Sequence, residues 1–207
     1  MFIEICPDWF QGFNLAFQII FLLVTASIAI TGYGAYKFFR QEEQLYLSLG
    51  WGVIALSYIA SSISQTAQLL TGYNTLMSAT GLAHMYLFLA GITILLFVYL
   101  RIKDSGVRAV LFVLLLGLMA FFNQSDWSAK MPAFHLLLAV LMFFILGQLT
   151  KAYRKTCSRA RLLVTAGFAL LTAGQLLLIT MHPIFFVLAM TLTLIGYVCI
   201  AARCFVR

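Results

Sequence analysis

Long apolar runs separated by short polar loops extend along almost the whole sequence. A helix that crosses a bilayer needs about 20 mostly apolar residues, and these runs approach or meet that length. We therefore expect an all-α integral membrane protein, a bundle of seven transmembrane helices that forms one membrane domain over residues 1–207. The predicted helices span residues 13–36, 45–69, 77–100, 109–122, 132–150, 162–181 and 183–203.

Two of these boundaries rest on single features of the sequence. The fourth run, Ala109 to Phe122, is the shortest, with a basic residue before it and a polar loop after it. The sixth and seventh runs are separated only around Met181-His182-Pro183. Proline lacks an N–H that the first turn of a helix would leave unpaired anyway. Pro183 therefore predicts a tight hairpin of two helices rather than one long helix.

The composition agrees with a bilayer environment, since 63% of the residues are hydrophobic and only 9% are charged. Soluble domains carry about 25% charged residues. The formal net charge of +7 needs no nucleic-acid partner, because basic loops follow from membrane topology. The lipid bilayer is the expected partner, and nucleic acid is not.

The distribution of charge between the loops predicts an orientation. Twelve of the thirteen Lys and Arg residues lie in loops 37–44, 101–108 and 151–161 or in the tail from 203, and the opposite loops hold only Lys130. The positive-inside rule places the basic loops in the cytoplasm. We expect the N-terminus outside and the C-terminus in the cytoplasm, an arrangement that an even number of helices would break.

An internal repeat is indicated when the chain is shifted by 117 residues. The shift places Ala35-Tyr36-Lys37 on Ala152-Tyr153-Arg154, and Gly50-Trp51 on Gly167-Phe168, without a gap. The first three helices then match the last three in the same orientation, with the fourth as a connector. This 3+1+3 parallel repeat is an arrangement known among transporters.

Carboxylates are missing from the apolar runs and no Lys or Arg lies at mid-membrane depth, which limits the chemistry. All six acids lie in loops or at the N-terminus, so a carboxylate proton relay or a cation-coupled pump is not expected. The layout resembles that of microbial rhodopsins, but the seventh run has no Lys to bind retinal and the third has no carboxylate counter-ion. No nucleophile–base pair, Gly-rich phosphate loop or metalloprotease motif occurs. We expect neither an enzyme nor a cofactor.

Neutral polar groups remain as candidates for a binding site. On the second run, five polar residues recur at helical spacing and share one face: Ser57, Ser61, Ser64, Gln65 and Gln68. Such residues hold neighbouring membrane helices together, and they equally suit the wall of a hydrated groove. Both interpretations stay open.

The repeat suggests a pocket between the two halves. The 117-residue shift places Gln18 on His135 and Tyr58 on Gln175, all in the predicted outer half of the membrane, where ligand sites at repeat interfaces have precedent. We predict a pocket that opens to the outside, lined by Gln18, Tyr58, Gln65, His84, Tyr86, His135 and Gln175.

His84 and His135 are also weak candidates for metal ligands. Two imidazoles can hold haem, and imidazole with nearby thioethers can bind copper. The sequence has no HxxxH or CxxC pair, and each His lies on a different helix. The simpler interpretation is that His84 and His135 make hydrogen bonds between helices and that His182 caps a loop.

One stretch resembles a known class of membrane modules. It runs from Tyr36 to Arg40, through Leu49-Gly50-Trp51, to Ala55-Leu56-Ser57-Tyr58. The pattern is similar to the first cytoplasmic turn of seven-helix sensor modules that head many prokaryotic signalling proteins, and of stand-alone relatives of unknown role. The resemblance implies a prokaryotic plasma (inner) membrane. No kinase or cyclase domain follows the last helix, so any signal would pass to a separate partner.

Three functions remain open from the sequence. The first is a receptor-like or accessory module that binds a small ligand or a membrane partner, with a basic face that suits an acidic cytoplasmic protein or anionic lipid. The second is a small-solute transporter similar in layout to SWEET-type sugar carriers. Pro7, Pro132 and Pro183 break no mid-membrane helix, which disfavours a transporter. The third is a haem- or copper-binding redox subunit built on His84 and His135.

Overall fold

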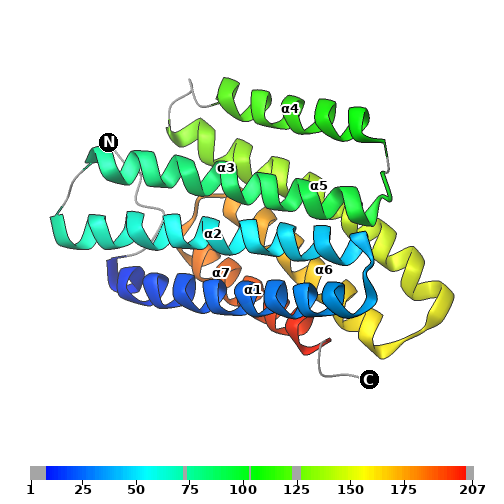
Figure 1. The fold of residues 1–207 in the computed structure, drawn as a ribbon. Helices are drawn as coiled ribbons and strands as arrows, with labels where there is room; N and C mark the ends of the chain where they lie inside the picture. Colours follow the sequence, from blue (N-terminus) through cyan, green and yellow to red (C-terminus); the bar gives the residue numbers. More distant parts are fainter. Residues whose placement is uncertain (1–7, 72–73, 103, 123–126, 204–207) are drawn as a thin grey trace.

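The computed structural model describes residues 8–71, 74–102, 104–122 and 127–203. All regular structure in these ranges is helical (Figure 1). A short 3₁₀ turn, η1 (Asp8–Phe10), precedes α1 (Gln11–Phe39), α2 (Glu42–Thr71), α3 (Asn74–Tyr99), α4 (Ser105–Phe122), α5 (Trp127–Thr156), α6 (Arg159–Ile179) and α7 (Pro183–Ala202).

The lengths and apolar character of the helices confirm the membrane class. Six of the described helices are long and apolar enough to cross a bilayer, and α4, whose apolar part runs from Ser105 to Ala120, is the shorter exception. Each predicted apolar run lies on one of these helices. The protein is therefore an all-helical, multi-pass membrane protein.

Several helices extend beyond the apolar runs that predicted them. The fourth run was expected to start at Ala109, whereas α4 begins at Ser105. The fifth was expected to start at Pro132, whereas α5 spans Trp127–Thr156 with Pro132 inside its first turns. A helix of 30 residues is about 45 Å long, more than a hydrocarbon core of about 30 Å. The polar ends of these helices therefore extend beyond the predicted apolar runs, and apolar composition alone does not reveal them.

The hairpin between α6 and α7 is confirmed. Pro183 occupies the first position of α7, and the side chain of His182 accepts a hydrogen bond from the N–H of Ile184. The chain reverses at Met181, whose φ of 51° lies in the left-handed region. Proline at this position starts the second helix without losing an intrahelical hydrogen bond.

Three other helices, α1, α3 and α5, end near a left-handed residue, and for α3 this residue is Arg101 with a φ of 55°. Arg40 closes α1 with a φ of 56°, and its N–H donates to the carbonyl of Tyr36 over 2.8 Å. Cys157, just after α5, has a φ of 46°, and its N–H donates to the carbonyl of Tyr153 over 2.8 Å. A left-handed residue with this hydrogen bond stops a helix and turns the chain sharply. The helices α1 and α5 lead directly into antiparallel neighbours.

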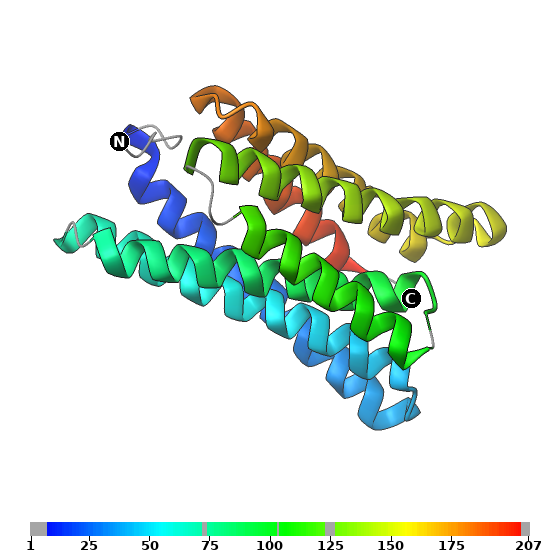
Figure 2. The same cartoon turned by 90° about the horizontal axis from the view of Figure 1, so that it is seen from above.

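The helices form two groups of three (Figures 1 and 2). Within the groups, α2 packs between α1 and α3, and α6 packs between α5 and α7. The groups meet where α1 contacts α7 and where α3 contacts α5. The fourth helix lies at the edge of the bundle, where it contacts α3 and α5 over a small area (Figure 1).

Glycines bring helix backbones close together in each group. A Cβ added to Gly91 of α3 would lie 2.9 Å from the carbonyl oxygen of Gly50 on α2. A Cβ added to Gly167 of α6 would lie 2.7 Å from the carbonyl oxygen of Gly196 on α7. Small residues of this kind allow membrane helices to pack closely.

Aromatic side chains fill the middle of the bundle. We call Phe21, Trp51, Tyr58, Phe168 and Tyr197 the aromatic layer; all five are buried. The hydroxyls of Tyr58 and Tyr197 lie 2.6 Å apart and share a hydrogen bond. Phe21 contacts both tyrosine rings, and Trp51 contacts Phe168 and Tyr197. The layer thus joins α1, α2, α6 and α7.

The described basic residues gather at one end of the bundle, which we call the basic end. They lie where α1, α3, α5 and α7 finish and where α4 and α6 begin: Lys37, Arg40, Arg101, Arg108, Lys151, Arg154, Lys155, Arg159, Arg161 and Arg203. Lys103 and Arg207 lie outside the described residues. Lys130 is buried near the opposite end, which we call the N-terminal end.

Candidate functional site

Buried and half-buried polar side chains gather in the half of the bundle toward the N-terminal end. We call this group the polar cluster; its members are Asn14, Gln18, Ser61, Ser62, Gln65, His84, His135 and Gln175. It lies between the aromatic layer and the N-terminal end of the bundle. Buried polar groups are costly inside a membrane protein and therefore mark candidate functional sites.

The inner face of α1 contributes Asn14 and Gln18. Buried residues on this helix recur at spacings of four and three, from Asn14 through Gln18, Phe21 and Thr25 to Ile28. This spacing places them on one helix face, and Phe21 on that face contacts the aromatic layer. Asn14 is only 8% exposed and Gln18 only 5%, so both amides point into the bundle.

The inner face of α2 continues the cluster. Trp51, Ile54, Tyr58 and Ser61 are buried at spacings of three and four, and Gln65 follows at the next position, half-buried. Because α1 and α2 are antiparallel and Phe21 meets Tyr58, the residues that precede Phe21 face those that follow Tyr58. Helix geometry places Gln18 near the level of Ser61 and Asn14 near that of Gln65.

Both cluster histidines join neighbouring helices. Nδ1 of His84 lies 2.9 Å from the carbonyl oxygen of Ser57, and Nδ1 of His135 lies 2.8 Å from Oε1 of Gln175. A carbonyl oxygen only accepts, so each Nδ1–H donates and each Nε2 is left as an acceptor. These contacts match the simpler interpretation of the histidines.

Four oxygen atoms in this region are buried without a hydrogen-bond partner among the described residues. They are Oδ1 of Asn14, Oε1 of Gln18, Oγ of Ser62 and Oε1 of Gln65. A buried acceptor without a donor costs about 1–3 kcal/mol, and native structures contain few of them. The α1–α2 side of the cluster is therefore a surface of acceptors that a group bearing N–H or O–H donors would satisfy.

The predicted pocket residues divide into three sets. Gln18, Gln65, His84, His135 and Gln175 belong to the polar cluster. Tyr58 is buried but belongs to the aromatic layer, where its hydroxyl bonds to Tyr197 and its ring contacts His84 at 5.8 Å. Tyr86 is half-buried and packs against the hydrophobic core.

Two residues of this region were missed from the sequence. Asn14 stands at the very start of the first apolar run, where an amide looks like part of a loop. Tyr197 is the one tyrosine in the most apolar helix, and nothing local to it indicates a partner on α2. The four-residue spacing of Asn14 and Gln18 was the one usable signal. The side chain of Gln68, also expected on this face, lies outside the described residues.

The chemistry of the cluster is that of neutral hydrogen bonding. Its acceptors are amide, hydroxyl and imidazole groups, without a carboxylate among the described members. Among the residues that the structure describes, no three His, Cys, Asp or Glu side chains come together as metal ligands. A neutral molecule rich in N–H or O–H groups fits this surface best.

No family model, curated protein or solved structure matches this chain. The resemblance to seven-helix sensor modules therefore remains a prediction.

Proposed function

We propose that the protein is a receptor-like or accessory module of seven transmembrane helices that binds a small neutral ligand in the polar cluster. The observation that carries the proposal is the pair of buried, unpartnered amide oxygens on Asn14 and Gln18. The ligand would donate hydrogen bonds to these oxygens. It would reach the cluster from the N-terminal end, because the aromatic layer fills the bundle on the other side.

The pairing of polar groups supports binding over a purely structural role. Polar residues that hold membrane helices together do so by bonding to each other or to backbone, as His84 and His135 do. The oxygens of Asn14 and Gln18 make no such bond within the described chain. Burying two unpaired amides one helical turn apart costs free energy, whereas leucine would fill the same space without that cost.

The charge distribution supports an orientation with the N-terminal end outside. All the basic residues named for the basic end lie on the same side of the bundle, and the positive-inside rule assigns that side to the cytoplasm. This orientation requires an odd number of spans, so α4 must cross the membrane in addition to the six longer helices. Its 18 residues extend about 27 Å, close to the hydrocarbon thickness of about 30 Å. The sensor resemblance favours a prokaryotic plasma membrane.

The close glycine contacts support the 3+1+3 repeat. Gly50 and Gly167 stand 117 residues apart, and each faces a glycine of the following antiparallel helix, Gly91 or Gly196. An aliphatic side chain four residues beyond the facing glycine, Leu95 or Ile200, covers the first glycine in both groups.

The positions at which two helices end also agree with the shift of 117 residues. Arg40 and Cys157 are also 117 residues apart, and both adopt the left-handed conformation that ends a helix. In the repeat, α1 corresponds to α5 and α3 corresponds to α7, so the α1–α7 contact corresponds to the α5–α3 contact. Both contacts are present. These features favour a pseudo-two-fold axis along the bundle.

A small-solute transporter is the second candidate, favoured by this repeat. Carriers of this layout bind solute between their halves, and glycine contacts allow helices to slide against each other. The aromatic layer would then have to open toward the basic end during each cycle. A receptor has no such requirement, so we place the transporter second.

Thermal unfolding of the detergent-purified protein tests the proposed function. The probes are glycerol, erythritol and glucose, three neutral donors of increasing size, each kept at millimolar concentration so that general osmolyte stabilisation stays small. A probe at 100 times its Kd stabilises a protein by about 2.7 kcal/mol, which raises Tm by roughly 5–10 °C for a chain of this size. We expect one class of probe to raise Tm, and Gln18→Leu to abolish the rise.

The matched control is Gln148→Leu, which removes a half-buried glutamine of α5 nearer the basic end. That variant should keep the full rise in Tm. A rise that survives Gln18→Leu, or the lack of a rise with all three probes, would count against the proposed site. Uptake of an active probe into proteoliposomes would favour the transporter over the receptor.

A further inference from the structure

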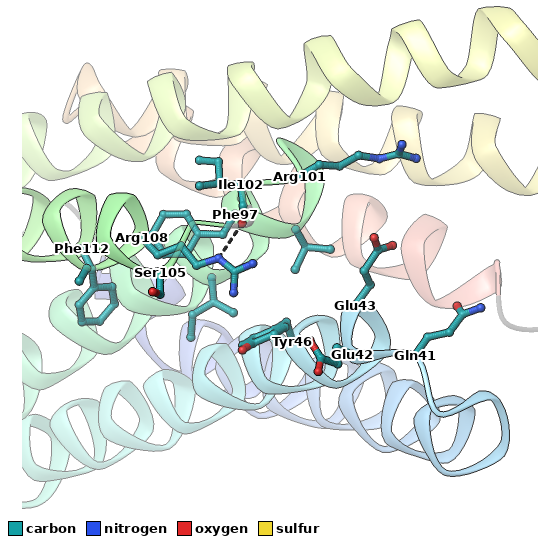
Figure 3. A pocket seen from close by; sticks show the side chains of 13 residues that line it. Gln41, Glu42, Glu43, Tyr46, Phe97, Arg101, Ile102, Ser105, Arg108 and Phe112 are labelled. Atoms are coloured by element: carbon teal, nitrogen blue, oxygen red, sulfur yellow. Dashed lines mark hydrogen bonds between the residues drawn. The ribbon is translucent and has the colours of Figure 1, made fainter.

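A second pocket lies at the basic end, away from the polar cluster. It has a volume of about 1020 Å³ and is lined by the start of α2, the end of α3 and the start of α4 (Figure 3). Small-molecule sites usually occupy about 300–1,000 Å³, so this pocket exceeds the needs of a free phosphate or a single amine. Its position between helix ends corresponds to the headgroup level of a bilayer.

The pocket carries opposite charges on its facing walls. Glu42 and Glu43 come from the first turn of α2, whereas Arg101 and Arg108 come from the end of α3 and the start of α4 (Figure 3). Throughout the described chain, no ion pair joins these acids to these arginines. The two carboxylates and the guanidinium of Arg108 therefore line one cavity without a direct ion pair, whereas the exposed side chain of Arg101 extends away from Arg108 and would rotate to meet a shared anion (Figure 3).

One of the arginines is held in place. The Nε–H of Arg108 donates to the carbonyl oxygen of Ile102 over 2.6 Å, and its guanidinium lies 5.1 Å from the centre of the Tyr46 ring. These contacts use one of the five guanidinium N–H donors. The remaining N–H groups are free to meet an anion. Arg101 is exposed at the rim of the pocket.

Part of the pocket wall is apolar. Phe97 of α3 and Ala109 and Phe112 of α4 belong to the lining, and Phe112 lies far from Glu42 and Glu43 (Figure 3). The fourth helix contacts α3 over only a small area, and its side chains Val110, Val113 and Leu114 are exposed. The pocket thus joins a charged mouth to an apolar wall, as a site for an amphiphile requires.

We propose that this pocket binds a zwitterionic glycerophospholipid with a primary ammonium group, of the phosphatidylethanolamine type, from the leaflet at the basic end. Arg101 and Arg108 would hold the phosphate, and Glu42 and Glu43 would accept hydrogen bonds from the ammonium. The parts of the acyl chains nearest the headgroup would lie against Phe97, Ala109 and Phe112. Charge complementarity selects this lipid, because the two carboxylates repel an anionic headgroup and a quaternary ammonium has no N–H to donate.

Native mass spectrometry of the detergent-purified protein tests the proposal. The probes are phosphatidylethanolamine, phosphatidylglycerol and phosphatidylcholine with identical acyl chains. We expect phosphatidylethanolamine to bind about fivefold more tightly than the other two, a difference of about 1 kcal/mol. The variant Glu42→Gln/Glu43→Gln should lose this preference, while Arg101→Gln should weaken the binding of all three lipids alike, because each carries the phosphate.

Two further variants separate this site from general lipid binding. Ala109→Phe fills the apolar part and should reduce binding of all three lipids, with the protein still monodisperse because Ala109 is exposed. Arg159→Gln removes an exposed charge at the same end but outside the pocket, and should change nothing. Equal effects of Arg101→Gln and Arg159→Gln would overturn the proposal.

The source of the headgroup is tested separately. Glycerophosphoethanolamine has the same charges without acyl chains, and it should fail to displace the lipid at equal concentration. Displacement would show that a soluble phosphate compound is the occupant and would overturn the lipid assignment. A dimer that Ala109→Phe dissociates would assign the pocket to a second copy of the chain and would overturn it as well.

Discussion

Gln18 and Gln175 are both buried glutamines of the polar cluster, but their surroundings differ. Oε1 of Gln175 accepts a hydrogen bond from His135, whereas Oε1 of Gln18 has no partner among the described residues. A satisfied amide contributes to stability, and an unsatisfied one costs free energy. The same substitution at the two positions should therefore act in opposite directions.

We expect Gln18→Leu to raise the free energy of unfolding of the ligand-free protein by about 1–3 kcal/mol, because it removes an unpaired buried oxygen. Gln175→Leu should lower it by a similar amount, because it leaves the Nδ1–H of His135 without its acceptor. Thermal unfolding in one detergent measures both changes. Destabilisation of equal size by the two substitutions would show that the Gln18 oxygen is satisfied in the folded protein.

The hydrogen bond between Tyr58 and Tyr197 makes the aromatic layer sensitive to single changes. Tyr58→Phe leaves the hydroxyl of Tyr197 buried without its partner, at a cost of about 1–3 kcal/mol, and Tyr197→Phe does the same to Tyr58. The double variant loses both hydroxyls and should cost less than the sum of the two. A double-mutant cycle by thermal unfolding measures the difference, and strictly additive costs would contradict the shared bond.

At the scale of helices, close packing within each group depends on a few glycines. A Cβ at Gly91 would lie 2.5 Å from Cγ1 of Ile54, and one at Gly167 would lie 2.6 Å from Cγ1 of Ile200. The facing backbone carbonyls are almost as near. Since backbone moves less easily than a flexible side chain, a methyl group at these positions pushes two helices apart.

Alanine at Gly91 or Gly167 should therefore lower the free energy of unfolding by about 1–3 kcal/mol. Gly147 of α5 provides the control, because a Cβ there meets nothing within 4 Å. Alanine at this helical position should be neutral or stabilise by about 0.5–1 kcal/mol through backbone entropy. Thermal unfolding of the three variants ranks them, and a neutral Gly91→Ala would rule out the tight contact.

The helices themselves were largely predictable from the sequence, whereas the contacts of the site were not. Apolar runs located every helix, and Pro183 located the last hairpin, because both signals are local. The start of α5 was missed because Trp127 to Met131 is too polar to resemble a span. The pairing of His135 with Gln175 could be approached through the repeat, but the partners of Tyr58 and His84 depend on how helices distant in sequence pack together.

At the scale of the molecule, the two regions for which we propose ligands lie toward opposite ends of the bundle. The polar cluster lies toward the N-terminal end, among the inner faces of α1, α2, α3, α5 and α6. The charged pocket lies at the basic end beside α4. With the aromatic layer between them, the first is suited to a solute from one side of the membrane and the second to a lipid from the other.

The proposed orientation predicts which thiols are reachable from each side. Cys157 is exposed at the basic end, and Trp9 is exposed at the N-terminal end. In a variant with Cys157 as its only cysteine, a membrane-impermeant maleimide should label inverted vesicles but not intact cells. A Trp9→Cys variant without other cysteines should show the reverse pattern. Labelling of both from the same side would refute the seven-span topology.

The edge position of α4 has a consequence for how such a chain can change over time. Three helices carry the chain from one side of a membrane to the other, so a second group of three placed directly after the first would be inverted. One further crossing restores the direction and returns the basic loops of both groups to the same side. In the proposed seven-span topology, α4 contributes little to packing, so its sequence would be constrained mainly by the requirement to cross. We expect substitutions to accumulate faster on its exposed face than on any helix of the two groups, while insertions or deletions that stop it crossing are eliminated.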